Sequence, residues 1–315
     1  MLSRVADSLY WLGRYSERIY ANAYIAHAQI DHMLELGRTD EQYQQQWECV
    51  LSIGGYIEDF HDRYGRYVEE DMLYYLLSDM KNLNSLERLL QSVRENVKNT
   101  RDCIPNALFE QWNGLYLCNK ENPIQKPYNV LNATKFLTAV QTTSLTATGV
   151  IDSLMTRDEC FLFIKIGKWL ERSEKTALVL LRLMENAHVL NRDFAVTFAL
   201  QLTNTFDEYT RRFRHRETEL VLDFLINDAY CSRSVIYGMR KIKNTLFEIE
   251  NYEVQSYATR LFQAIEELED IMEQDITTMS REARIDWVRD IHAKCIQLGP
   301  IFSQTYYLTA PILVK

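Results

Sequence analysis

Hydrophobic residues near the N-terminus recur in steps of three and four, which is the spacing of one face of an α-helix. The series runs from Leu2 through Leu9 and Ile19 to Met33 without a break. Side chains at this spacing form one continuous apolar stripe, typical of a helix that packs along its whole length against neighbours. We therefore expect an unbroken helix over residues 2–36.

A second stretch of the chain repeats this pattern. The stripe from Phe163 to Met184 follows the stripe from Leu9 to Ile30 at a constant offset of 154 residues. At the same offset, residues 13–18 align with residues 167–172, and both segments read Gly-x3-Glu-Arg. The match indicates that a long helix with the same motif occurs twice.

The similarity between the two halves continues beyond these helices. Residues 76–79, followed by Asn84 and Ser85, match residues 225–228, followed by Arg233 and Ser234, at an offset of 149 residues. Duplicated helical units normally pack against each other, because neither buries its apolar face alone. We predict an all-α multi-helix bundle built from two diverged repeats of about 150 residues in a pseudo-two-fold arrangement. The first repeat covers 1–154 and the second 155–315, and together they form one compact unit.

Composition supports long helices. The 315 residues include only 10 glycines and 5 prolines, while 47% are hydrophobic, enough for a sizeable core. A β-rich chain of this length would need many more turn residues. We expect ten to twelve helices, near residues 2–36, 41–66, 68–79, 84–102, 105–118, 129–154, 157–187, 192–215, 216–227, 232–250, 252–280 and 282–308.

The charge of the chain bears on its partners. A net charge of −9 gives no general attraction to a phosphate backbone, so we do not expect a nucleic-acid partner. The basic run at residues 211–216 is a local exception, read either as a solvated or ion-paired helix face or as a docking patch for an acidic partner or a phosphate.

Cysteine spacing and hydropathy indicate the compartment. The six cysteines form no C-x-x-C pair and no metal-finger spacing. No signal peptide is recognisable, and no apolar run approaches the roughly 20 residues that span a bilayer. We expect a cytoplasmic protein with reduced thiols and no membrane segment.

The Gly-x3-Glu-Arg helices carry the most informative polar residues. A helical side chain leans over the residue one turn earlier, so Glu17 lies over Gly13 and Glu171 over Gly167. Glycine inside a helix costs about 1 kcal/mol relative to alanine. Its presence under each glutamate therefore indicates that space is needed there, for a close approach of helices or for a bound group.

Each glutamate of the motif is accompanied by two cations. An arginine follows it directly, and Arg14 or Lys168 lies one turn before that arginine on the same face. Two interpretations remain open. Glu17 with Arg172, and Glu171 with Arg18, could form buried pairs that fix the geometry of crossing helices. Alternatively, the arginines line a polar cavity that binds a carboxylate, phosphate or peptide group.

Residues 155–159 lead into the second motif helix. Thr156 could cap that helix, with Glu159 completing a capping box, which leaves Arg157 as a possible site residue. The candidate residues of the polar cavity are Arg14, Glu17, Arg18, Arg157, Lys168, Glu171, Arg172 and Glu174.

The sequence contains no recognised catalytic or cofactor signature. There is no P-loop, no G-x-G-x-x-G, no H-E-x-x-H and no G-x-S-x-G. The histidines are scattered, and the Glu-x-x-His pairs of di-iron bundles are absent. We predict neither a cofactor nor a metal.

These motifs resemble one family. Residues 1–18 are similar to the opening of the α-E domain family, residues 155–174 to its second motif, and residues 92–96 with Arg101 and then 112–113 to the stretch between them. In that family Glu-Arg usually continues with a further acid and a threonine. The second copy keeps them as Glu174 and Thr176, whereas the first copy does not. Any role for the additional acid therefore rests on the second copy.

The resemblance implies a functional setting. Proteins of this kind occur beside, or fused to, a circularly permuted ATP-grasp protein, with a transglutaminase-like protein and sometimes a proteasome-like hydrolase encoded nearby. ATP-grasp enzymes activate a carboxylate for attack by an amine. The resemblance thus implies a non-catalytic helical partner, or a substrate-binding subunit, of an ATP-grasp amide or peptide ligase that presents a peptide or amine substrate.

Two other functions remain open at this point. The protein could be an enzyme that uses Glu17 or Glu171 as an acid or base in a polar cavity. It could also be a structural scaffold whose Glu-Arg pairs are internal struts.

Overall fold

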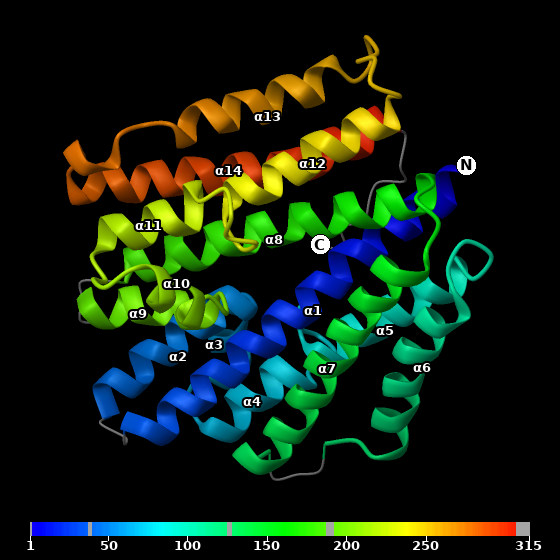
Figure 1. The fold of residues 1–315 in the computed structure, drawn as a ribbon. Helices are drawn as coiled ribbons and strands as arrows, with labels where there is room; N and C mark the ends of the chain where they lie inside the picture. The colour runs from blue at the N-terminus through cyan, green and yellow to red at the C-terminus, as the bar shows by residue number, and fades with distance from the viewer. Residues whose placement is uncertain (1, 37–39, 125–127, 187–191, 307–315) are drawn as a thin grey trace.

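The computed structural model describes residues 2–36, 40–124, 128–186 and 192–306. The described residues form α-helices, one short 3₁₀ helix and no strand, which confirms the all-α class (Figure 1). None of these helices has the length and apolar character needed to cross a membrane. The elements in chain order are α1 (Ser3–Leu36), α2 (Asp40–Gly54), α3 (Ile57–Tyr64), α4 (Glu69–Leu77), α5 (Leu86–Asn99), α6 (Asn106–Glu121), α7 (Val130–Leu154), α8 (Glu159–Glu185), α9 (Arg192–Leu202), α10 (Phe206–Arg212), α11 (Thr218–Asn227), α12 (Val235–Ile249), α13 (Thr259–Met272), η1 (Ile276–Thr278) and α14 (Arg281–Thr305).

The two helices that carry the Gly-x3-Glu-Arg motif cross at the centre of the fold. Their backbones approach so closely that a Cβ added at Gly13 would lie 2.1 Å from the carbonyl oxygen of Ile164. A Cβ added at Gly167 would lie 2.1 Å from the carbonyl oxygen of Tyr10. The space under each glutamate is therefore occupied by the backbone of the other helix. Of the two expected uses of that space, the structure contains the close helix approach.

The remaining helices surround this crossing. Helices α5 and α7 pack on α1, while α12 and α14 pack on α8, with α13 lying against α12 and α14 (Figure 1). Helices α5 and α12 are strongly amphipathic and bury one face each against their central helix. The shared buried positions are Leu86, Leu90, Val93 and Val97 in α5 and Val235, Met239, Ile242 and Leu246 in α12.

Both helices begin with the same capping arrangement. The side chain of Ser85 accepts a hydrogen bond from the backbone N–H of Arg88, and that of Ser234 from the backbone N–H of Tyr237. A serine at this position satisfies one of the free N–H groups of the first turn. The matching segments of the two halves therefore start their helices in the same way.

Three helices expected from the sequence are divided in the structure. Residues 41–66 form α2 and α3, residues 192–215 form α9 and α10, and residues 252–280 contain α13 and the short η1. The chain leaves α9 through Asn204 at φ 55°, in the left-handed region that stops a helix. Between α2 and α3 the backbone of Tyr56 is extended, and its N–H donates to the hydroxyl of Tyr75 at 3.0 Å.

The expected cap of the second motif helix is wrong. Helix α8 begins at Glu159, and Asp158 is its N-cap, with a side-chain oxygen that accepts from the backbone N–H of Phe161. Asp158 sits directly before the helix, whereas Thr156 lies two residues too early to reach the free N–H groups of the first turn.

Candidate functional site

The two Glu-Arg motifs pair reciprocally across the helix crossing. The Arg172 guanidinium binds both carboxylate oxygens of Glu17, with Nε to Oε1 at 2.8 Å and Nη2 to Oε2 at 2.7 Å. Arg18 binds Glu171 in the same way, with Nε to Oε1 at 2.6 Å and Nη2 to Oε2 at 2.9 Å. Bidentate pairs of this kind are strong and fix geometry. This arrangement is the one that the strut interpretation requires.

Each carboxylate also holds a second arginine. Nη1 of Arg233 lies 2.6 Å from Oε1 of Glu17. On the other side, Nε of Arg14 lies 2.6 Å from Oε2 of Glu171, and its Nη2 lies 2.7 Å from Glu174. Every oxygen of the two central carboxylates therefore has a cationic partner.

Burial and charge act in opposite directions on these acids. Glu17 and Glu171 are 5% and 2% exposed. Burial would raise the pKa of Glu17, but the charges of Arg172 and Arg233 outweigh it and lower that pKa to about 2. For Glu171, Arg14 and Arg18 likewise outweigh burial and lower the pKa to about 2. Both acids are ionised at neutral pH, far from the pKa that general acid–base catalysis at neutral pH favours.

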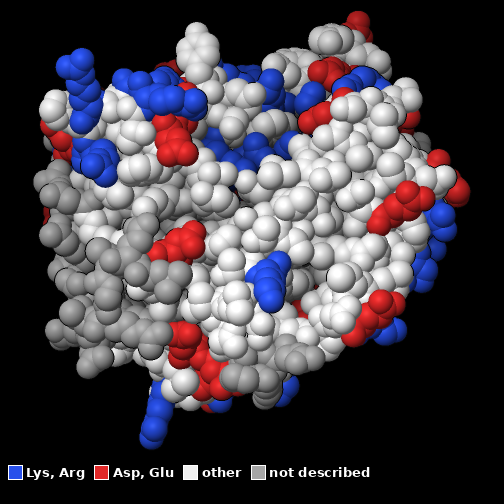
Figure 2. All heavy atoms as spheres, turned by 60° about the horizontal axis from the view of Figure 1, so that its bottom comes forward, with Lys and Arg blue, Asp and Glu red and all other residues white. Residues whose placement is uncertain are grey.

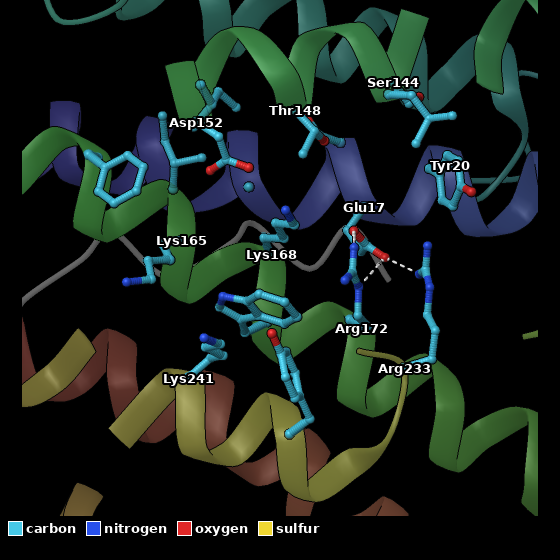
Figure 3. A pocket seen from close by; sticks show the side chains of 18 of the residues that line it. Glu17, Tyr20, Ser144, Thr148, Asp152, Lys165, Lys168, Arg172, Arg233 and Lys241 are labelled. Carbon is cyan, nitrogen blue, oxygen red and sulfur yellow. Dashed lines mark hydrogen bonds and ion pairs between the residues drawn. The ribbon is translucent and has the colours of Figure 1, made fainter. Parts of the chain in front are cut away.

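A cavity of about 510 Å³ opens beside the Glu17–Arg172 pair. It lies between α7 on one side and α8 and α12 on the other, with α1 at its back (Figure 3). A hollow with Lys and Arg atoms at its floor is visible on the face shown in Figure 2. The volume falls within the range of small-molecule binding sites.

Cations outnumber acids around this cavity by six to three. The acids are Glu17, Asp152 and Glu248, and the cations are Arg157, Lys165, Lys168, Arg172, Arg233 and Lys241. The formal surplus of three positive charges contrasts with the net charge of −9 for the chain. The cavity is therefore a local positive centre in an acidic protein.

The cations of the cavity differ in how they are bound. Arg172 and Arg233 hold Glu17, as described above, and Arg157 donates to backbone carbonyls near the end of α7, including that of Met155 at 3.3 Å. The Lys165 ammonium is 3.8 Å from the Glu248 carboxylate, longer than a hydrogen bond. These four cations have protein partners.

Two lysines of the cavity have no such partner. Among the described residues, the ammonium groups of Lys168 and Lys241 make no hydrogen bond or ion pair within bonding distance. They lie 5.2 Å from the ring centroid of Trp169 and 5.1 Å from that of Tyr237, respectively. Burial, together with the like charge of Arg172, lowers the pKa of Lys168, and Glu17 offsets this only in part. An anion placed beside Lys168 would stabilise its charged form.

The residues predicted as a site divide into two groups. Six of them form the ion-pair network at the crossing, namely Arg14, Glu17, Arg18, Glu171, Arg172 and Glu174. Lys168 and Arg157 line the cavity instead, where Glu17 and Arg172 also reach its wall. The structure therefore does not bring all eight residues together.

Several residues of the cavity were not predicted. Arg233 is one of them. The alignment of the two halves includes this residue, but the matching position 84 is an asparagine, so no shared cation drew attention to it. Lys165, Lys241, Trp169 and Tyr237 also line the cavity. No motif singles them out, since they meet only when α8, α12 and α7 are packed together.

Two other sequence features can be placed. Over the residues that the structure describes, no group of three or more His, Cys, Asp or Glu could hold a metal ion. In the basic run, Arg211 pairs with Glu208 and Arg212 with Asp228, so these two arginines follow the ion-paired interpretation.

The fold and the site define the class: an all-helical bundle whose two central helices are locked by reciprocal Glu-Arg pairs. The chain belongs to the Alpha-E family, described as a predicted α-helical domain with a conserved ER motif, whose model matches residues 1–307. Neither a curated protein nor a solved structure was found to match the chain.

Proposed function

We propose that the protein is a non-catalytic helical partner, or the substrate-binding subunit, of an ATP-grasp amide or peptide ligase system in the cytoplasm. One observation carries the binding part of this proposal: an open cavity of about 510 Å³ presents two lysines that form no ion pair among the described residues, Lys168 and Lys241, beside a saturated ion-pair network. The ligase part rests on the resemblance to the α-E family. A peptide or an amine is the substrate that this system would present, and a transglutaminase-like protein is a further expected partner.

The two alternatives account for less of the site. An enzyme that uses Glu17 or Glu171 as acid or base needs a carboxylate that exchanges protons near neutral pH, whereas both acids have a pKa of about 2. A scaffold alone needs the pairs but has no use for a cavity with surplus cations. We assign the structural role to the Glu-Arg pairs and the binding role to the cavity next to them.

We further propose that the halves 1–154 and 155–315 are diverged copies related by a pseudo-two-fold axis through the helix crossing. The reciprocal glycine contacts and Glu-Arg pairs support this. So does a further pair of contacts: Nδ2 of Asn22 donates to the carbonyl oxygen of Asn84 at 2.9 Å, and Oγ1 of Thr176 donates to that of Arg233 at 2.8 Å. These residues correspond at the two offsets found in the sequence.

Co-purification tests the partnership. The chain is expressed with the circularly permuted ATP-grasp protein expected beside it in the genome, and only the ATP-grasp protein carries an affinity tag. We expect both chains to elute together in size-exclusion chromatography with a fixed stoichiometry. Separate elution of two folded proteins at micromolar concentration would reject the proposal that this chain is a ligase subunit.

A further inference from the structure

We propose that the cavity takes a small ligand with two or more oxyanion groups, and that Lys168, Lys165 and Lys241 bind those groups. This inference deepens the proposed function, on which it rests, by naming the ligand class of the same cavity. It follows from an imbalance between the two sides of the helix crossing.

On one side of the crossing, the charge of Arg14 is neutralised by two acids. Arg14 contacts the carboxylates of Glu171 and Glu174 at 2.6 and 2.7 Å. The bidentate pair of Arg18 with Glu171 completes this side. Two acids therefore face two arginines, and the third cation nearby, Lys175, donates to the carbonyl oxygen of Ile53 at 3.1 Å, so each cation on this side has a protein partner.

On the other side, the equivalent cation is left without an acid. The alignment of the halves places Lys168 at the position of Arg14, and Tyr20 at the position of Glu174. The remaining acid, Glu17, has both oxygens bound by Arg172 and Arg233. Three cations thus surround one central carboxylate, and Lys168 lines the cavity without an ion pair among the described residues, with Glu17 and Asp152 acting on its charge only from a distance (Figure 3).

Two more lysines extend this positive surface. Lys165 lies one turn before Lys168 on α8, and Lys241 lies across from them on α12 (Figure 3). The acids Asp152 and Glu248 also line the cavity, but Glu248 approaches Lys165 only to 3.8 Å. The formal surplus is three positive charges, and the three lysines lie on two helices. A ligand with a single negative charge would therefore leave cations unmatched.

The residues that line the cavity indicate the chemical character of the ligand. Trp169 and Tyr237 stand edge to face at 5.4 Å between their ring centroids, and they provide an apolar wall between the lysines. Lysine ammonium groups bind phosphates and carboxylates as point charges, without requiring a planar fork. The shared chemistry is therefore a compact oxyanion, borne either by phosphate groups or by carboxylates.

Titration calorimetry on the full chain, at low ionic strength, tests the inference. The probes are inorganic pyrophosphate, for phosphate groups, and triglutamate, for carboxylates. We expect one site per chain for at least one probe, and Lys168→Met to weaken binding about tenfold, the value of one charge-assisted contact. Binding of pyrophosphate alone assigns a phosphorylated ligand, and binding of triglutamate alone assigns a polycarboxylate.

A matched pair of variants on α12 controls for charge. Lys241→Met removes a cavity cation, whereas Lys243→Met removes a lysine whose Nζ binds Glu269 at 2.9 Å, away from the cavity. We expect only Lys241→Met to weaken binding. The inference is overturned if neither probe binds below about 1 mM, or if Lys168→Met binds like the wild type. It is also overturned if Lys243→Met loses as much affinity as Lys241→Met.

Two further measurements separate loss of anion binding from unfolding of the variant and from failure of the ligase partnership. Lys168 is not part of any ion pair among the described residues, so Lys168→Met should keep the wild-type thermal midpoint. Calorimetry uses this chain alone and does not depend on a ligase. Anion binding without co-purification would reject the ligase partnership and leave the ligand class standing, and the converse result would reject the ligand class only.

Discussion

At the scale of single residues, the central acids are structural. Glu17 and Glu171 are almost fully buried, and each is held by two arginines at 2.6–2.9 Å. A buried pair contributes less net stability than its contacts suggest, because both ions lose their hydration. Removing one partner is different, because it leaves the other charge buried without compensation.

We predict that Glu17→Gln and Glu171→Gln each lower the free energy of unfolding by about 3–5 kcal/mol. Arg172 and Arg233 lose their counter-charge in the first variant, and Arg18 loses its own in the second, where Arg14 keeps Glu174. Urea unfolding followed by circular dichroism measures the loss. Glu267→Gln is the control, since Glu267 is exposed and pairs with Lys294 at the surface, and its unfolding midpoint should stay close to that of the wild type. Wild-type stability in both central variants would show that these pairs are not struts.

Acid should remove the same stabilisation in the wild type. The pKa of Glu17 is about 2 in the folded chain, against an ordinary value of 4.5. A lowered folded-state pKa stabilises the fold above the unfolded pKa, and this contribution, on the order of 3 kcal/mol, is lost as the pH falls from about 4.5 to about 2. Unfolding measured across that range should therefore show wild type and Glu17→Gln converging. A difference that stays constant with pH would contradict the lowered pKa.

At the scale of elements, the crossing of α1 and α8 depends on two glycines. Their Cβ positions are occupied by backbone oxygen of the opposite helix, which cannot move as a flexible side chain could. The helices must therefore separate if either glycine gains a side chain, and the ion pairs above them would lengthen as well. The glycines and the Glu-Arg pairs act as one structural unit.

We predict that Gly13→Ala and Gly167→Ala each destabilise the protein by at least about 3 kcal/mol, through overpacking against backbone. Gly149→Ala in α7 is the matched control, because a Cβ there would meet nothing within 4 Å. That substitution should leave stability unchanged or raise it by about 0.5–1 kcal/mol. Thermal unfolding of the three variants measures these effects. Equal unfolding midpoints for Gly13→Ala, Gly167→Ala and Gly149→Ala would mean that the two helices do not approach as closely as described.

The sequence predicts the elements well where periodicity is long and uninterrupted. The stripe from Leu2 to Met33 lies within α1 except for Leu2, which directly precedes that helix, and the stripe from Phe163 to Met184 lies within α8. The divisions at Asn204 and Tyr56 escaped prediction, because a single left-handed or extended residue stops a helix without disturbing the hydrophobic spacing on either side. The Thr156 cap was wrong because Asp158, two residues later, offers similar capping chemistry directly before the first residue of α8.

At the scale of the whole molecule, the two sides of the crossing have different surroundings. The pairing of Glu17 with Arg172 and of Glu171 with Arg18 was one of the two interpretations that the motif allowed, and the structure contains it. It could not predict which side is open. That depends on how α7, α12 and α14 pack, and on differences between the halves, such as tyrosine at position 20 where the second half has glutamate at the matching position 174.

The cavity was for the same reason only partly predictable. Lys168 and Arg157 were singled out because they lie on or beside a motif helix. Lys241 comes from α12, and Ser144 and Thr148 from α7, so a sequence pattern has no means of placing them together. A cavity lined by four helices becomes visible only when tertiary packing is known.

We propose that the Glu-Arg pairs hold the fold while the lysine-lined cavity serves an ATP-grasp ligase. The most direct test is ATP turnover by the ATP-grasp protein, with its substrate supplied as a cell extract of small molecules and peptides, in the presence of wild-type chain or of Lys168→Met. We predict that the wild type stimulates turnover and that Lys168→Met, still folded and still in the complex, stimulates it much less. Equal stimulation by both chains, or none by the wild type, would contradict the claim.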